Sequence, residues 1–186
     1  MDFRKRVVVI NGSGGVGKDA FCRACSRYAG VAVRSSVDPI KDAARLLGWE
    51  GGKSAADRKF LSDLKALSAA YNDWPMQFMR GAVNAFHGYG DDDEILFLHI
   101  REPEEIERAA REFCAVTVLV KNRRIPKITT NRSDRLVNEY WYDSVIHNDG
   151  SLADLDRMAE RFVSWLRAGC PFKPAIFSPG DAPAMP

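Results

Sequence analysis

The chain has 186 residues, which is enough for one domain with a sizeable hydrophobic core. Its 46% hydrophobic and 28% charged content is that of an ordinary soluble globular protein, and no apolar run approaches the length of a membrane span. The net charge of +2 argues neither for nor against nucleic acid, and we expect neither nucleic acid nor a membrane as a partner.

The four cysteines do not form a metal array. Cys22-x-x-Cys25 has no second pair that would complete a zinc site, so the sequence favours free, mostly buried thiols. No secretory signal precedes the first predicted strand. We therefore expect a cytoplasmic protein.

The first predicted element is an apolar, β-branched strand over residues 7–10, followed by a glycine-dense turn and a helix from about Gly17 to Tyr28. The spacing Gly12-x4-Gly17-Lys18 is that of a phosphate-binding P-loop, in which glycines let backbone N–H groups converge on an anion. The alternative is a glycine-rich turn with a surface lysine. We predict that the turn binds a nucleoside triphosphate through Asn11, Gly12, Ser13, Gly14, Gly15, Val16, Gly17, Lys18, Asp19 and Ala20.

Asp19 stands where the P-loop pattern has Ser or Thr, whose hydroxyl binds Mg²⁺. A carboxylate is also a good oxygen ligand, so Asp19 is the predicted metal ligand, directly or through water. The alternative is that Asp19 only stabilises the first helical turn, where acidic residues are favoured.

A helical insertion over about residues 38–90 follows a short strand at 31–34. Asp38-Pro39 predicts a helix through Leu47, because proline suits the first helical turn. A second helix is predicted from about Ser54 to Ala70, where apolar residues recur at helical spacing (Phe60, Leu61, Leu64, Leu67 and Tyr71), and a third is predicted up to Phe86. Basic and aromatic side chains there suit a nucleotide acceptor, although each aromatic alone is better explained by packing. The predicted acceptor-binding residues are Asp38, Lys41, Arg45, Arg58 and Lys65.

The next strand, 95–98, ends at His99, where a motor or GTPase would have an acidic residue that binds the metal. Arg101 follows and is predicted to neutralise a transferring phosphoryl group. The alternative is a salt bridge to Glu102 or Glu105. A helix over 103–113 and a buried strand over 115–120 come next.

A basic segment lies between the last two predicted strands, with six basic residues and one acidic residue between Lys121 and Arg135. We interpret residues 121–138 as a lid that closes over the phosphates and excludes water. Arg124 and Arg132 are the predicted catalytic residues of this lid. The alternative is a solvated basic loop.

The last predicted strand is 143–146, and Ser151 caps a final helix. Five strands with crossover helices predict a three-layer α/β/α sandwich with a largely parallel sheet and the phosphates at its carboxyl edge. One domain is expected over residues 1–170. The proline-rich tail, 171–186, is expected to be loosely docked or disordered.

Three segments resemble bacteriophage deoxynucleoside monophosphate kinases and their P-loop kinase relatives: 17–19, 38–43 and 145–152. The resemblance spans most of 7–166, but the middle insertion matches poorly. It implies ATP and Mg²⁺ as cofactors, transfer of the γ-phosphoryl group to a (deoxy)nucleoside monophosphate, and often a homodimer.

The resemblance also implies that the Asn148 to Gly150 turn, with Asn148 and Gly150 as ligands, lies beside the adenine of ATP. The family often has Asp two residues before the arginine that aligns with Arg101, whereas this sequence has His99. That difference leaves the role of this strand end open.

The expected reaction is in-line attack by an acceptor phosphate held by Lys41 and arginines of the insertion. Lys18, Arg101 and the lid arginines would spread the developing charge, and a phosphate nucleophile needs no strong general base. Two alternatives remain. One is a kinase for another acceptor, such as dephospho-coenzyme A or phosphomevalonate, with Asp38 as the base for a hydroxyl. The other is an ATP-dependent regulator that does not transfer phosphate.

Overall fold

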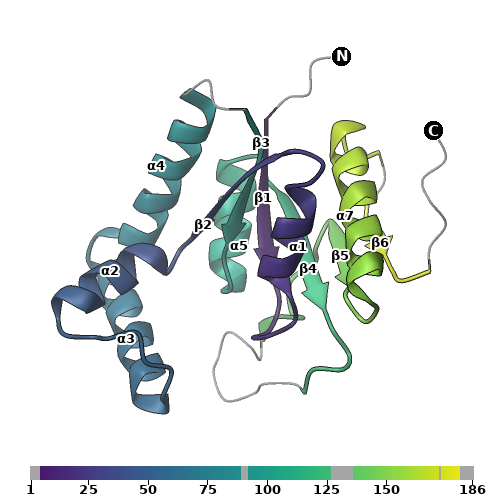
Figure 1. Cartoon of the computed structure of the whole chain (residues 1–186). Coiled ribbons are helices and arrows are strands. Elements are labelled where there is room, and N and C mark those ends of the chain that lie inside the picture. Colours follow the sequence, from purple (N-terminus) through teal and green to yellow (C-terminus); the bar gives the residue numbers. More distant parts are fainter. Residues whose placement is uncertain (1–4, 89–91, 127–135, 172, 181–186) are drawn as a thin grey trace.

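The computed structural model describes residues 5–88, 92–126, 136–171 and 173–180 (Figure 1). Strands and helices alternate along most of the described chain. They are β1 (Arg6–Asn11), α1 (Lys18–Cys25), β2 (Gly30–Ser35), α2 (Asp38–Leu46), α3 (Ala55–Asn72), α4 (Trp74–Gly88), β3 (Asp93–His99), α5 (Pro103–Glu112), β4 (Val116–Lys121), β5 (Ser144–His147), α7 (Leu152–Arg167) and β6 (Ala175–Phe177).

The strands form one parallel sheet in the order β2-β3-β1-β4-β5-β6. The α/β class and the parallel sheet predicted from the sequence are confirmed. β1 lies between β3 and β4, with Val8 paired with Phe97 on one side and with Val116 on the other. The chain leaves β1 toward β2 and leaves β4 toward β5, in opposite directions across the sheet. The carboxyl ends of β1 and β4 therefore flank a switch point, where ligands bind in open α/β sheets.

The described residues contain six strands, so the predicted number of five was wrong. β6 lies within the tail that was expected to be loosely docked or disordered, and it pairs in parallel with β5. Three residues between prolines are too short to show a periodic pattern, and tertiary packing determines their conformation. Phe177 is buried, with its ring centroid 5.8 Å from that of Phe162 and 6.1 Å from that of Trp165.

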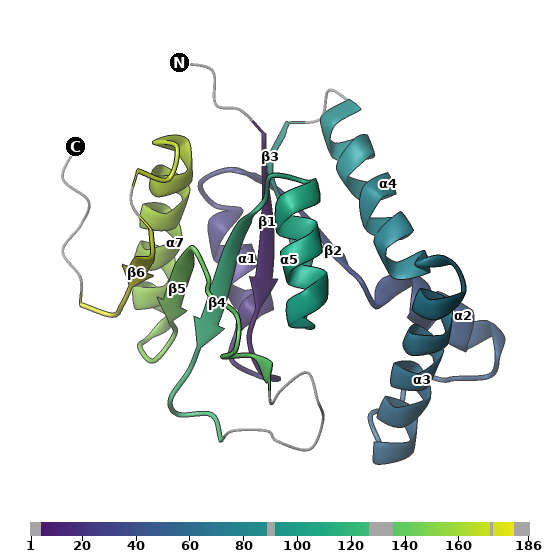
Figure 2. The same cartoon turned by 180° about the vertical axis from the view of Figure 1, so that it is seen from behind.

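Helices cover both faces of the sheet (Figures 1 and 2). On one face, α1 and α7 bury Phe21 and Phe162 against Phe97, with ring centroids 5.3 to 6.4 Å apart. On the other face, α4 and α5 bury Met79 and Ile106. Burying a side chain of this size contributes about 1.5–3 kcal/mol, so the two cores hold the strand ends in place.

The helical insertion, α2 to α4, extends beyond β2 at the edge of the sheet (Figure 2). A capping box between Ser54 and Asp57 begins α3, and Asp73, with a left-handed φ of 58°, separates α3 from α4. None of the described helices is long and apolar enough to cross a membrane.

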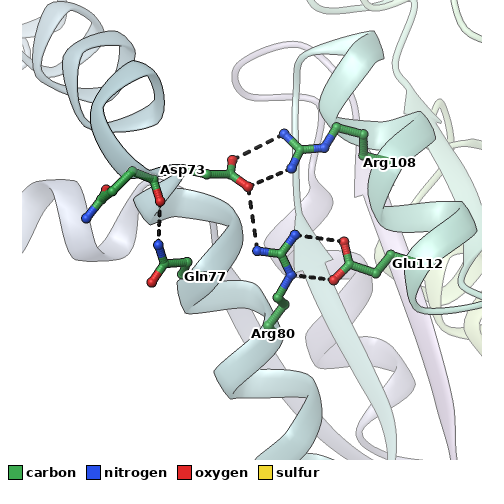
Figure 3. Close-up of polar contacts among 6 residues, drawn as sticks. Asp73, Gln77, Arg80, Arg108 and Glu112 are labelled. Atoms are coloured by element: carbon green, nitrogen blue, oxygen red, sulfur yellow. Dashed lines mark hydrogen bonds and ion pairs between the residues drawn. The ribbon is translucent and has the colours of Figure 1, made fainter.

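Charged side chains link this insertion to α5 (Figure 3). Arg108 donates two hydrogen bonds to the Asp73 carboxylate, at 2.6 and 3.2 Å. Arg80 lies 3.5 Å from the same carboxylate and pairs with Glu112. The junction between α3 and α4 is thus attached to the helix that follows the β3 strand end.

Candidate phosphate-binding site

The turn after β1 has the backbone geometry of an anion-binding loop. Gly12, Gly15 and Gly17 have φ of 147°, 81° and 97°, which L side chains rarely adopt. A Cβ on Gly12 would lie 2.5 Å from the Val120 carbonyl oxygen, and one on Gly17 would collide with the Asn148 amide. The glycines are therefore required by backbone conformation and by close packing. Gly17 is also the N-cap of α1, so the helix dipole points at the loop.

Lys18 folds back over this loop. Its ammonium donates hydrogen bonds to the carbonyl oxygens of Gly12 and Ser13, the latter at 2.9 Å. The cation is therefore held among loop carbonyls, where an incoming phosphate oxygen would compete for its protons.

Asn11 lies behind the loop and is fully buried. Its Oδ1 accepts a hydrogen bond from Gly12 N at 2.7 Å, and its Nδ2 donates to the Tyr142 hydroxyl at 2.8 Å and to the Arg101 carbonyl at 3.2 Å. The side chain of Asn11, a predicted nucleotide ligand, therefore links the end of β1 to the segment after β3 and to the segment before β5.

The turn after β5 is attached to the loop through Asn148. Asn148 Nδ2 donates to the Val16 carbonyl at 2.9 Å, and its backbone N–H donates to the Lys121 carbonyl at 2.8 Å. The next residue, Asp149, is buried and accepts hydrogen bonds from the backbone N and Nε of Arg123 at 2.6 and 2.7 Å. Gly150 follows directly, close to Asp154. The carboxyl ends of β1, β4 and β5 thus form one connected edge.

His99 ends β3 beside the first turn of α1. Its Nε2 lies 3.8 Å from both Asp19 Oδ1 and Cys22 Sγ. Burial lowers the pKa of His99, and the Asp19 charge only partly opposes that effect, which favours the neutral imidazole. Asp19 is exposed and acidic, so its carboxylate fits the prediction of a Mg²⁺ ligand. Among the described residues no group of three or more His, Cys, Asp or Glu could hold a metal, so other ligands would come from phosphate and water.

The predicted catalytic arginines are exposed where they are described. Arg101 follows β3, and its backbone carbonyl accepts the hydrogen bond from Asn11. Arg124 is exposed in the turn after β4, where its backbone N donates to Asn122 Oδ1 at 2.9 Å. Arg132, with half of the predicted lid, lies outside the described residues.

Two of the five predicted acceptor residues lie in the first turn of α2, and the other three lie farther along α2 and α3. Asp38 and Lys41 lie at the start of α2, 3.9 Å apart, and Asp38 accepts a hydrogen bond from Ser35 N at 2.8 Å. Arg45 pairs with Asp42, and Arg58 is exposed near the start of α3. Lys65 pairs with Glu105 of α5 at 2.7 Å. Of the five residues, only Asp38 and Lys41 therefore lie next to the carboxyl end of β2, which pairs with the end of β3.

Sequence reasoning missed Tyr142, and it missed the pairing of Asp149 with Arg123, as parts of this edge. Asp149 stood inside a segment that matches the family pattern, which was an available signal. Tyr142 offered none, because only the fold brings its hydroxyl to Asn11.

The four cysteines are free thiols, as predicted. Cys22 and Cys25 are buried, whereas Cys114 is exposed and Cys170 is half-buried. Burial, with a smaller contribution from Asp19, raises the pKa of Cys22 to about 12, and burial also raises the pKa of Cys25. These two thiols therefore lack the low pKa of a redox Cys-x-x-Cys pair.

No protein-family model matches this sequence, and no curated protein matches it. Among solved structures, the chain is similar to a thymidylate kinase from Ehrlichia chaffeensis. The match has 10% identity and a TM-score of 0.28, and it covers 96% of this chain and 91% of the other. At that level of similarity, neither fold nor function is transferred from it.

Proposed function

We propose that this protein is a P-loop kinase that transfers the γ-phosphoryl group of ATP to a (deoxy)nucleoside monophosphate. The observation that carries the proposal is the loop over Gly12 to Gly17, which has three left-handed glycines and ends β1 at the switch point of the sheet. Lys18 extends into that loop. This combination of converging amides and a central ammonium is suited to a polyphosphate.

The connected edge supports a role for the neighbouring turns in nucleotide binding. Asn148 touches the loop backbone, so a nucleotide lying over Val16 and Gly17 would lie next to the Asn148 to Gly150 turn. This geometry agrees with the adenine position that the family resemblance implies. The Asp149–Arg123 pair would keep that turn in place during binding.

Phosphoryl transfer requires mainly that the protein position the two substrates and stabilise the negative charge that develops on the transferred group. Lys18 would bind the β- and γ-phosphates, and Arg101 and Arg124 are exposed cations on the adjacent strand ends. Asp19 would hold Mg²⁺, which when bound would offset the triphosphate charge. Lys41 would contact the acceptor phosphate from the first turn of α2. A phosphate oxygen is already nucleophilic, so neutral His99 need not act as a base.

A panel of acceptors tests the proposal. The purified protein is incubated with ATP and Mg²⁺ alone, with each (deoxy)nucleoside monophosphate, and with dephospho-coenzyme A or phosphomevalonate, while ADP release is recorded. Release that depends on one of the monophosphates supports the proposal. Release only with another acceptor, release without any acceptor, or ATP binding without release each contradicts it, and these outcomes indicate a different kinase, an ATPase and a binding protein respectively.

A further inference from the structure

A continuous series of hydrogen bonds leads from the phosphate loop to the segment before β5, and we call it the Asn11–Tyr142 network. Gly12 N donates to Asn11 Oδ1 at 2.7 Å, and Asn11 Nδ2 donates to the Tyr142 hydroxyl at 2.8 Å. The Tyr142 hydroxyl donates in turn to the Val137 carbonyl at 3.0 Å. A branch runs from Asn11 Nδ2 to the Arg101 carbonyl at 3.2 Å. Asn11, Tyr142 and Val137 are at most 4% exposed, so these bonds are shielded from water.

The network fixes the orientation of both of its side chains. The Asn11 amide has one oxygen and two N–H donors, and it faces one donor, Gly12 N, and two acceptor oxygens. A flipped amide would place donor against donor and oxygen against oxygen. The Tyr142 hydroxyl accepts from Asn11 and therefore gives its single proton to Val137. Burial raises the pKa of Tyr142 to about 12, so the hydroxyl keeps this proton at neutral pH.

Tyr142 is itself anchored to the sheet and not only to the loop. The next residue, Asp143, accepts hydrogen bonds at Oδ2 from the backbone N and the hydroxyl of Thr117 in β4, at 2.9 and 3.1 Å. The backbone N of Asp143 donates to the same hydroxyl at 2.9 Å. The Tyr142 ring also packs edge-on against Tyr140, with the centroids 5.0 Å apart. The Tyr142 hydroxyl therefore has a position that the rest of the fold determines.

The network joins two parts of the candidate site that the sheet alone does not join. The register of β1 with β3 ends at the pair Ile10 and His99. Asn11 and Arg101 lie beyond that pair, and the Asn11 side chain continues the connection between the two strand ends through the Arg101 carbonyl. The same side chain holds Gly12 N at the start of the phosphate loop. The loop and the Arg101 backbone thus share one anchor.

We propose that Tyr142 is a positioning residue for phosphoryl transfer: its hydroxyl fixes Asn11, which sets the place of Arg101 relative to the phosphate loop. This inference rests on the proposed function, and it gives Tyr142 no contact with ATP or with the acceptor. Groups that stabilise transition-state charge act through preorganised placement, and a shift of about 1 Å can cost on the order of 100-fold in rate. A buried network with all its donors used provides such placement.

Tyr142→Phe tests the inference, because it removes the hydroxyl and keeps the ring. With ATP, Mg²⁺ and the monophosphate that serves as acceptor, we expect turnover to fall at least ~10-fold. The dissociation constant for ATP with Mg²⁺, measured by calorimetry, should change less than ~3-fold, because Lys18 and the loop glycines remain. Tyr140→Phe is the matched control. It removes a hydroxyl that donates to Glu107 at 3.1 Å, away from the network, and should leave turnover within about twofold of the wild type.

A double-mutant cycle separates placement of Arg101 from a general loss of structure. Arg101→Ala removes the side chain but leaves the carbonyl that accepts from Asn11. If Tyr142 acts by placing Arg101, Tyr142→Phe should lower turnover by less than ~2-fold in the Arg101→Ala background, because the group to be placed is absent. Two independent, multiplying losses would overturn the inference.

The remaining outcomes distinguish this inference from the proposed function. Circular dichroism melting of each variant checks that it is folded at the assay temperature. Transfer by the wild type with unchanged turnover in Tyr142→Phe, or with an equal loss in Tyr140→Phe, overturns the inference and leaves the proposed function standing. Absence of transfer to every monophosphate by the wild type contradicts the proposed function and the inference together.

Discussion

The side chain of Asn148 donates a hydrogen bond to the backbone carbonyl of Val16, 2.9 Å away and 132 residues earlier in the chain. The backbone N–H of Asn148 also donates to the Lys121 carbonyl at the end of β4. One residue therefore connects the glycine loop, the β4 end and the turn after β5. The conformation of the loop is therefore stabilised by contacts with distant segments as well as by its own glycines.

Replacing Asn148 with Ala should weaken ATP binding about fivefold without unfolding the protein. The substitution removes one hydrogen bond to the loop backbone, and such a bond contributes about 1 kcal/mol. Isothermal titration calorimetry with ATP and Mg²⁺ measures the effect. Asn84→Ala, at an exposed position of α4, serves as the control. An unchanged affinity in the Asn148 variant would show that the loop needs no external support.

Replacing Lys18 with Ala should remove nearly all phosphoryl transfer, at least ~100-fold, while the fold remains intact. The ammonium donates hydrogen bonds to the carbonyl oxygens of Gly12 and Ser13, and water can replace it at both oxygens. Loss of one group that stabilises transition-state charge lowers turnover about 10²–10³-fold. Steady-state turnover is compared with that of Lys59→Ala, which removes an exposed lysine from α3. Turnover within tenfold of the wild type would refute the role assigned to Lys18.

Asp149 should make stability depend on pH in the acidic range. Burial acts to raise the pKa of Asp149, but the hydrogen bonds from Arg123 outweigh it and the net pKa is lowered. A lowered folded-state pKa stabilises the protein above the ordinary value of 3.8, and this contribution is lost as the pH falls through the folded value.

Asp149→Asn is therefore expected to lower the free energy of unfolding by about 1 kcal/mol at pH 7, with a smaller difference near pH 3. Urea unfolding at both pH values measures this, with Asp63→Asn in an exposed pair as the control. A difference that is the same at both pH values would rule out the charge of Asp149 as its cause.

The sequence predicted the parts of the fold that local patterns specify. The apolar runs of β1, β3 and β4 and the glycine spacing before Lys18 are short-range signals, and the structure places each of them as a strand or turn. β6 was missed because its three residues become a strand only through pairing with β5 and burial of Phe177.

The contacts that organise the candidate site could not be predicted in this way. Asn11 was predicted as a nucleotide ligand from its place before the loop, whereas the hydrogen bonds of its side chain to Gly12, Tyr142 and the Arg101 carbonyl depend on the fold. Lys65 was predicted to bind an acceptor from its charge alone, whereas its ion pair with Glu105, forty residues away, could not be read from that charge. A residue's type and spacing indicate what it can bind, whereas its actual partner depends on which elements the topology brings together.

The buried cysteines should resist alkylation in the native protein. Cys22, with a pKa of about 12, and Cys25, whose pKa is also raised by burial, are protonated and shielded. Iodoacetamide at pH 8 should therefore modify Cys114 first, Cys170 more slowly, and the other two only after unfolding in guanidinium. Mass spectrometry of peptides over time measures the order. Early modification of Cys22 would show that the α1 thiols open to solvent in the native state.

The Asp73 carboxylate should control how firmly α3 and α4 are held against α5. Asp73→Asn keeps the size of the side chain, and Asn tolerates the left-handed φ of 58°, so the substitution mainly removes charge from the pairs with Arg108 and Arg80. These groups are partly exposed, so the loss of global stability should be below about 1 kcal/mol. The local effect should be larger, because the pairs join the helical insertion to α5, and local opening of the insertion would break them.

Hydrogen exchange followed by mass spectrometry measures this local effect. Peptides from residues 55–88 should exchange at least about threefold faster in Asp73→Asn than in the wild type, while peptides from β1 and β4 exchange at the same rate. Asp156→Asn is the matched control, because it removes the charge of a partly exposed carboxylate that pairs with Arg27 and accepts a hydrogen bond from Tyr28 on the α1 and α7 side of the sheet. Equal exchange over 55–88 in both variants would mean that packing of Met76 and Met79, and not charge, holds the insertion in place.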